Sequence, residues 1–426
     1  MDALDECEER TLYQFIRHVT SLPGSHTPDI PLKFLFTSRP YLRIVMELSS
    51  PATTTIRLKG EEEIISIATD VTRVINEGIE SLESVWGQHG GLGYFRNLLE
   101  SSADRTFLWV SLILDIFRDC DDDSQEEFTK LVTTTPPDLT ELYTKILDKS
   151  KSPDKARRVL SIVVAAARPL TLREMNAAVR IKREHRSSKE LGYMSAEFEK
   201  MVKNWCGLFV RVIDSKIYLV HQTAREFLIK GSIPGHGNWQ YTLSLVDYNF
   251  LLADICISYL SLEDFENEPL VVHPSDYYGR AEFSSYVEKY VLRDYAASHW
   301  ADHFRDSQIH QMELLEFTRL ICEGGSKRFL TWWRVYWRNG RYYRPFPADF
   351  TNLMIASWLG QEIVVERLLQ EGGEANARSE SYGTALTIAA FREDESITRI
   401  LLRGNVRAYI LGREYNILES VSWDIQ

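Results

Sequence analysis

Cysteine is scarce in this sequence: five residues are spread over 426 positions, and no two of them stand at a Cys-x-x-Cys spacing. Structural zinc sites and disulfide frameworks both require clustered cysteines. The sequence therefore argues against these two classes of protein. An odd number of scattered thiols is typical of a reducing compartment, and we expect a cytoplasmic protein.

Long apolar runs and a positive net charge are also lacking. The longest apolar stretches, FLWVSLIL and VLSIVVAAA, are far shorter than the ~20 residues that cross a bilayer, and the acidic N-terminus has no signal-peptide core. The formal net charge of −12 repels nucleic acids and anionic membranes as a whole. We therefore expect no membrane contact, and nucleic-acid binding only through a local basic patch.

The sequence also lacks the pattern of a phosphate-binding loop. The pattern G-x-x-x-x-G-K-[ST], whose backbone N–H groups and lysine hold nucleotide phosphates, does not occur, and neither does the dipeptide Gly-Lys. No Ser/His/Asp, Cys/His or HExxH arrangement supports an independent catalytic centre or metal site. We expect that this chain by itself binds no cofactor and is not an enzyme.

The first 151 residues contain two kinds of pattern. After the acidic DALDECEE comes an amphipathic helical stretch, and LKFLFTSRP reads as a short buried strand, as in a parallel sheet covered by helices. From residue 49 onward, EEIISIATDVTRVINEGIESL and SSADRTFLWVSLILDIF carry apolar stripes with a period of 3.6 residues. We expect part of an α/β sheet over residues 1–48 and helices over residues 49–151.

Residues 152–232 contain clear signals for helix starts and for a turn. Three helix starts and one hairpin turn are indicated, at Ser152-Pro153, Thr171-x-x-Glu174, Thr223-x-x-Glu226 and, for the hairpin, Asp214-Ser215. A further helix is expected at SAEFEKMVKNW, before the hairpin. Three helices, a β-hairpin and a final helix predict a winged-helix topology. That topology does not by itself imply DNA binding.

A repeat follows a helical, aromatic-rich region over residues 233–346. TNLMIASWLGQEIVVERLL and TALTIAAFREDESITRILL superimpose at an offset of 33 residues, so that Thr351 aligns with Thr384 and Ala356 with Ala389. This period and the pattern T-x-L-x-x-A are those of ankyrin repeats. We expect two repeats within residues 347–426, with the start of a partial third near YNILES left open.

Six segments, taken in order, are similar to the NACHT branch of signalling ATPases, in particular to fungal NACHT–ankyrin proteins. They are DALDEC, FLFTSRP, TFLWVSLIL, PPDLTELYTKIL, ARRVL…AAARPLTLREMNAAV and YLVHQTAREFLI, and they cover about residues 1–230. The resemblance implies a mainly α protein. Its parts are the end of an α/β P-loop NTPase core with Walker B and sensor 1 (1–48), a helical domain (49–151), a winged-helix domain (152–232), a helical region (233–346) and ankyrin repeats (347–426).

The same resemblance implies roles for five residues in a complete nucleotide site with ATP or ADP and Mg²⁺. Asp2 would hold Mg²⁺ through water, and Asp5 or Glu6 would polarise the attacking water. Arg39 would sense the γ-phosphate, and His221 would touch ADP from the winged helix. Because the P-loop is missing, these roles are expected only if a P-loop lies upstream or is supplied in trans.

The first functional hypothesis is a scaffold that binds other proteins through its ankyrin repeats and helical region, with self-association as a further expectation. Its candidate contact residues on the ankyrin surface are Trp358, Glu362, Arg378, Tyr382 and Arg392. The alternative is a complete nucleotide-switch ATPase of the innate-immunity or heterokaryon-incompatibility kind.

A third hypothesis is nucleic-acid or membrane binding through the basic and aromatic stretch KRFLTWWRVYWRNGRYYR. Against it, Phe329, Trp333 and Trp337 fall on one helical stripe, which is typical of a buried helix. We therefore expect a buried helix at this position.

Overall fold

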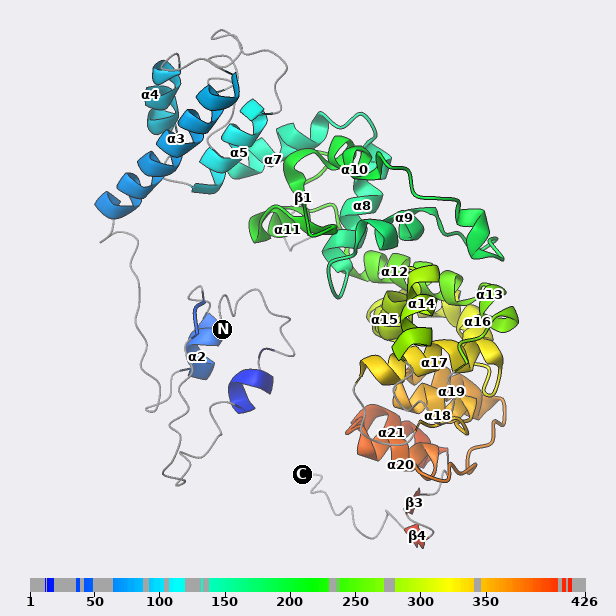
Figure 1. Cartoon of the computed structure of the whole chain (residues 1–426). Helices are drawn as coiled ribbons and strands as arrows, with labels where there is room; N and C mark the ends of the chain where they lie inside the picture. The colour runs from blue at the N-terminus through cyan, green and yellow to red at the C-terminus, as the bar shows by residue number, and fades with distance from the viewer. Residues whose placement is uncertain are drawn as a thin grey trace. The chain divides into compact units, whose positions relative to one another are not determined.

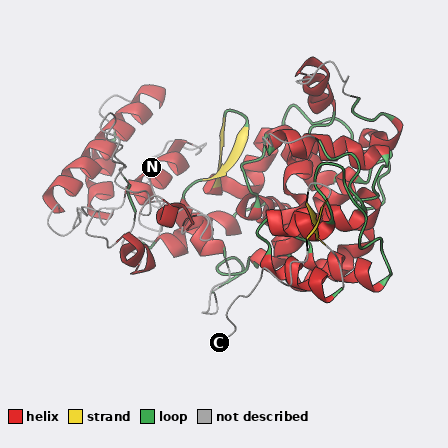
Figure 2. Cartoon of the chain, turned by 90° about the horizontal axis from the view of Figure 1, so that it is seen from below, coloured by secondary structure: helices red, strands yellow, loops and turns green. Residues whose placement is uncertain are grey.

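The structure is a computed structural model that describes residues 138–229, 235, 237–271, 280–340, 346–404, 408–410 and 413–415, together with shorter segments before residue 138. Those earlier segments are residues 12, 14–18, 36–38, 42–48, 64–86, 92–102, 107–118 and 132. The chain forms two compact units, Met1–Pro137 and Asp138–Gln426. Helices dominate both units (Figures 1 and 2).

The first unit contains four labelled helices: α2 (Leu42–Leu48), α3 (Ile64–Trp86), α4 (Gly93–Ser102) and α5 (Phe107–Arg118). The long helix α3 packs against α4 and α5, as its apolar stripe predicts. The expected strand in LKFLFTSRP is not seen in the described residues 36–38, which have no strand conformation. There, Phe36 packs its ring edge-on against Phe15 in a small core, and the rest of LKFLFTSRP lies outside the described residues.

The second unit begins with a helical and hairpin segment. Its elements are α7 (Leu139–Asp148), α8 (Pro153–Ala165), α9 (Leu172–Arg180), η2 (Ser188–Leu191), α10 (Phe198–Cys206), η3 (Gly207–Phe209), β1 (Val210–Ile213), β2 (Lys216–Leu219) and α11 (Gln222–Leu228). Strands β1 and β2 are antiparallel, and Asp214 and Ser215 at the turn have φ of 49° and 61°. Positive φ at both central residues is the geometry of a type I′ hairpin, which confirms the predicted turn.

Of two predicted helix starts in this segment, one is present and one is not. The capping box is present, because Thr171 accepts from the backbone N–H of Glu174 and Glu174 accepts from that of Thr171. The predicted cap at Thr223 is wrong. Helix α11 starts at Gln222, two residues before the start that a Thr223 cap would give, and its N-cap is His221.

Helix α7 packs with the segment that follows it, although the sequence placed it in the preceding helical domain. Tyr143 of α7 lies against the rings of Phe209 and Phe227, with ring centroids 4.9 and 5.4 Å away. The domain boundary expected near residue 151 therefore lies before α7, at Asp138.

A helical region continues the second unit. Its elements are α12 (Leu245–Leu260), α13 (Asp264–Asn267), α14 (Arg280–Lys289), α15 (Arg293–Asp306), η4 (Gln308–His310), α16 (Gln311–Ile321) and α17 (Lys327–Asn339). Helix α12 packs along α15 and against α8, and α15 packs against α17. A continuous core thus runs from the first helices of the unit to α17.

Two helix pairs end the described body: α18 (Asn352–Trp358) with α19 (Glu362–Gln370), and α20 (Ala385–Phe391) with α21 (Glu395–Arg403). Thr351 caps α18 and Thr384 caps α20, each by accepting from the backbone N–H three residues on. Helices α18 and α20 pack together, as do α19 and α21. A short hairpin of β3 (Ala408–Ile410) and β4 (Arg413–Tyr415) follows. Apart from Tyr415, the segment YNILES lies outside the described residues.

Candidate functional site

His221 is the one residue of the expected nucleotide site that the structure describes. It is exposed at the start of α11. Its Nδ1 accepts from the backbone N–H of Thr223 at 3.2 Å and lies 3.0 Å from the Thr223 hydroxyl. That hydroxyl is in turn 2.8 Å from the hydroxyl of Tyr143.

These contacts fix the chemistry of the imidazole. Because Nδ1 accepts from a backbone N–H, the proton of the neutral ring is carried by Nε2. Nε2 can therefore donate to an anionic oxygen, which fits a phosphate ligand. Tyr143 fixes the position of the Thr223 hydroxyl through their hydrogen bond. Its side chain is buried, and burial raises the pKa of its hydroxyl.

The other four expected nucleotide-site residues, Asp2, Asp5, Glu6 and Arg39, lie outside the described residues. Within the part of the chain that is described, no group of three His, Cys, Asp or Glu side chains could hold a metal ion.

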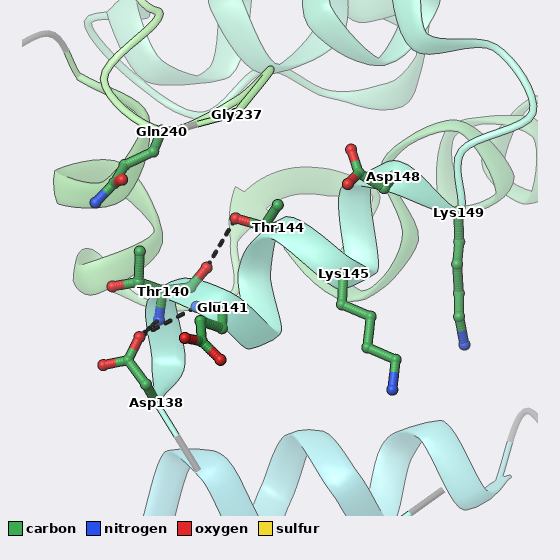
Figure 3. Close-up of a pocket in the computed structure, with 9 residues that line it drawn as sticks. All are labelled: Asp138, Thr140, Glu141, Thr144, Lys145, Asp148, Lys149, Gly237 and Gln240. Atoms are coloured by element: carbon green, nitrogen blue, oxygen red, sulfur yellow. Dashed lines mark hydrogen bonds between the residues drawn. The ribbon is translucent and has the colours of Figure 1, made fainter. Parts of the chain in front are cut away.

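A shallow hollow of about 720 Å³ lies on α7 (Figure 3). Asp138 and Glu141 lie at one end of it, and Lys145 and Lys149 lie toward the other end and extend to the same side of the helix. Desolvation and the nearby charge of Lys149 lower the pKa of Lys145. The hollow is lined by Asp138, Thr140, Glu141, Thr144, Lys145, Asp148, Lys149, Gly237 and Gln240, and none of the expected site residues is among them.

The candidate contact residues of the helix pairs divide into two groups. Glu362, Arg378 and Arg392 are exposed, as expected for a contact surface. Trp358 and Tyr382 are only 1% and 5% exposed, so their assignment to the surface needs correction. Both rings lie in an aromatic cluster that the preceding helix completes.

That cluster is supplied by α17. The ring centroid of Trp337 lies 4.8 Å from that of Trp358 and 5.9 Å from that of Tyr382. The ring centroid of Phe350 lies 5.2 Å from that of Tyr382. The aromatic face of the basic stretch is therefore core. Bases could not stack on Phe329 or Trp333, which are fully buried. Burial of this stripe agrees with the buried-helix interpretation of the sequence.

A polar junction joins the segment around α9 to α15, and sequence reasoning did not find it. Arg168 binds Glu174 through two hydrogen bonds of 2.6 and 3.0 Å and reaches Asp294 of α15 at 3.3 Å. Its guanidinium also stacks over the ring of Tyr295. The capping box at Thr171 showed that Glu174 was structural, but its arginine partner could not be read from helix-start rules.

Beside this junction runs a chain of hydrogen bonds whose central link is buried. The backbone N–H of Ala167 donates to the Tyr295 hydroxyl at 3.1 Å, and that hydroxyl lies 2.8 Å from Nε2 of His303. Nδ1 of His303 lies 2.7 Å from the side-chain oxygen of Asn249. Because an amide oxygen only accepts, Nδ1 carries the proton and Nε2 accepts from Tyr295. The imidazole is held neutral, and burial lowers its pKa to about 3.

Comparison with known proteins gives two kinds of match. Residues 143–236 match the model of the winged-helix domain of GPI inositol-deacylase. The chain is 26% identical over 350 residues to vegetative incompatibility protein HET-E-1 of Podospora anserina, an alignment that covers 79% of this chain and 25% of that protein. It is 23% identical over 311 residues to azaphilone pigments biosynthesis cluster protein L of Monascus ruber, covering 66% of this chain and 62% of that protein.

The chain thus spans less than two thirds of the length of either relative. No solved structure matches it. The matches support a winged-helix domain that includes most of α7, and a relationship to NACHT-type proteins. Within the described residues, no helix has the length and apolarity needed to cross a membrane.

Proposed function

We propose that this chain is a regulatory, partner-binding part of a NACHT-type signalling protein of the incompatibility kind. The similarity to HET-E-1 over most of this chain supports a signalling role, and the winged-helix match fits the NACHT-type architecture that the sequence resembles. On this proposal the chain binds other proteins and does not turn over nucleotide by itself.

Partner binding is assigned to the two terminal helix pairs, which we identify as ankyrin-type repeats. The observation that carries this is the recurrence of structural detail at the 33-residue offset. Three pairs of positions share a role: the N-caps Thr351 and Thr384, the positive-φ turn residues Gly360 and Glu393, and the stacked rings of Trp358 and Phe391. Such repeats stack into an extended surface that binds proteins.

The position of the pairs explains how so few repeats can be stable. Roughly three repeats are normally needed, since each buries its apolar face only against a neighbour. Here Trp337 of α17 packs on Trp358 and Tyr382, so α17 covers the face that a preceding repeat would cover. Gln361 also donates to the backbone carbonyl of Ala301 in α15 at 2.9 Å.

The test compares two charge-reversal variants of the full chain. Glu362→Lys, Arg378→Glu and Arg392→Glu together should abolish recovery of the protein that co-purifies with the wild-type chain from its own cells.

The matched control reverses three other exposed charges of α19 and α21, namely Glu366→Lys, Arg399→Glu and Arg403→Glu. It should retain the partner, and the melting temperatures should agree. Loss of the partner in both variants, or in neither, would contradict the proposal.

A nucleotide switch in the whole protein is the second candidate, and the exposed, proton-donating Nε2 of His221 favours it. ATP or ADP with Mg²⁺ would then be held mainly by residues upstream of the winged helix, with His221 reaching a phosphate oxygen. We expect calorimetry to find no Mg-ATP binding by this chain alone. In a chain extended to include a P-loop, His221→Ala should speed ADP release, whereas unchanged release would remove His221 from the site.

A further inference from the structure

Helix α16 and the short helix η4 before it carry a stripe of exposed apolar side chains. Ile309 is 82% exposed, Met312 61% and Leu320 42%. Met312, Glu316 and Leu320 stand at i, i+4 and i+8, and Ile309 lies one turn before Met312, so all four project from one side of the helix. Single exposed apolar residues are common on proteins, but several in one stripe indicate an interaction surface.

The stripe extends toward the neighbouring helix α12. Phe250 of α12 is half-buried, and its ring lies 4.9 Å from the imidazole of His310. Phe317 of α16 is also half-buried beneath the guanidinium of Arg183. Apolar side chains therefore lie on η4, on α16 and at the seam between α12 and α16, with Glu316 between Met312 and Leu320.

Carboxylates surround this surface. The side chains of Asp247, Glu313 and Glu316 are 60%, 58% and 73% exposed. His310 lies between Asp247 and Glu313, at 3.0 and 3.1 Å, and offsets at most one of these charges. Arg319 lies between the carboxylates of Glu371, at 2.5 Å, and Glu316, at 3.7 Å, so its single positive charge is shared by two acidic side chains and the rim stays acidic.

We propose that this stripe is a docking site for a basic amphipathic helix of a partner protein. Ile309 to Leu320 extends for about 17 Å along the helix, which matches roughly three turns of a partner helix. Leucine-like side chains of the partner cover the stripe, and its lysines or arginines face the carboxylate rim. A second copy of this surface or an anionic membrane would bring like charges together, which disfavours both.

The stripe itself uses no residue of α18–α21 and does not include His221, so it does not depend on the proposed function, although Arg319 of α16 contacts Glu371 at the end of α19. Binding here would bring a second partner to the helical region, independently of any protein held by α18–α21.

The test uses the full chain and two fluorescent peptides of about 20 residues, long enough to form a helix. One has leucine on one face and lysine on the other, and the second replaces each lysine by glutamate. The leucine–lysine peptide should bind in an anisotropy titration, with an affinity that falls as salt is raised. Ile309→Ser combined with Met312→Ser should weaken it at least about tenfold.

The matched control is Val271→Ser, because Val271 is 70% exposed but lies outside η4 and α16. It should leave binding unchanged, and circular dichroism should confirm that all variants are folded. Equal binding by the double variant, or equal binding of the leucine–glutamate peptide, would overturn the proposal. So would concentration-dependent dimers of the free chain that the double variant abolishes, since the occupant would then be a second copy.

Discussion

Mild acid should destabilise the body formed by residues 138–404 through His303. This side chain is 3% exposed and is held neutral between Tyr295 and Asn249. Protonating Nε2 would break the hydrogen bond that it accepts from Tyr295 and would place a charge in the core. Burial and the neighbouring His299 therefore lower the pKa of His303 from 6.5 to about 3.

The magnitude follows from the difference in proton affinity between the two states. The unfolded chain takes up the proton near pH 6.5, and the folded chain does so only near pH 3. The stability that His303 contributes is therefore fully present above pH 6.5 and is lost progressively as the pH falls toward 3. Between pH 7 and pH 5 the free energy of unfolding should fall by roughly 2 kcal/mol from this group alone.

Urea unfolding followed by tryptophan fluorescence measures this loss, because Trp300, Trp332 and Trp333 are buried in the same body. Other groups titrate in the same range, so the wild type is compared with His303→Gln, whose amide can bond to both neighbours but does not ionise. The wild type should lose about 2 kcal/mol more than the variant between pH 7 and pH 5. Equal losses in both proteins would refute the assignment of a buried, neutral histidine.

Three further substitutions test the packing and the polar contacts. Trp358→Ala should lower the free energy of unfolding, measured by urea titration, by about 3 to 5 kcal/mol, because it opens a cavity between α17 and both helix pairs. A loss below about 1 kcal/mol would mean that α17 does not cover the helix pairs. Glu174→Ala should lower the free energy of unfolding by roughly 2 to 3 kcal/mol, since it removes the α9 capping box and one partner of the half-buried Arg168. Glu174→Gln should recover only part of that stability. Tyr143→Phe should lower the free energy of unfolding by about 1 kcal/mol and should increase amide exchange at Thr223, because the hydroxyl that positions the His221 turn is lost. Unchanged amide exchange at Thr223 would show that Tyr143 does not have that role.

Local signals in the sequence were reliable where the decisive contact lies within a few residues. The capping box of Thr171 and Glu174 and the turn at Asp214 and Ser215 depend only on side chains and backbone torsions nearby. The cap at Thr223 failed because His221 competes for the same helix start, and the Thr223 hydroxyl is engaged by His221 and by Tyr143, which is distant in sequence.

Long-range packing was the part that sequence patterns could not supply. Trp358 and Tyr382 lie in the segment that carries the 33-residue sequence repeat, and the repeat pattern alone placed them on the surface. Only the docking of Trp337 from α17 buries them. Similarly, nothing within one turn of Arg168 reveals that Asp294, over 120 residues away, completes its junction.

Hydrogen exchange of the full chain, with and without the protein that co-purifies with it, tests the central claim most directly. If the helix pairs are the partner-binding surface of a signalling protein, the partner should slow exchange in residues 376–393, which contain the turn around Arg378 and the exposed end of α20 at Arg392. Protection confined to other parts of the chain, with exchange in residues 376–393 unchanged, would contradict the account.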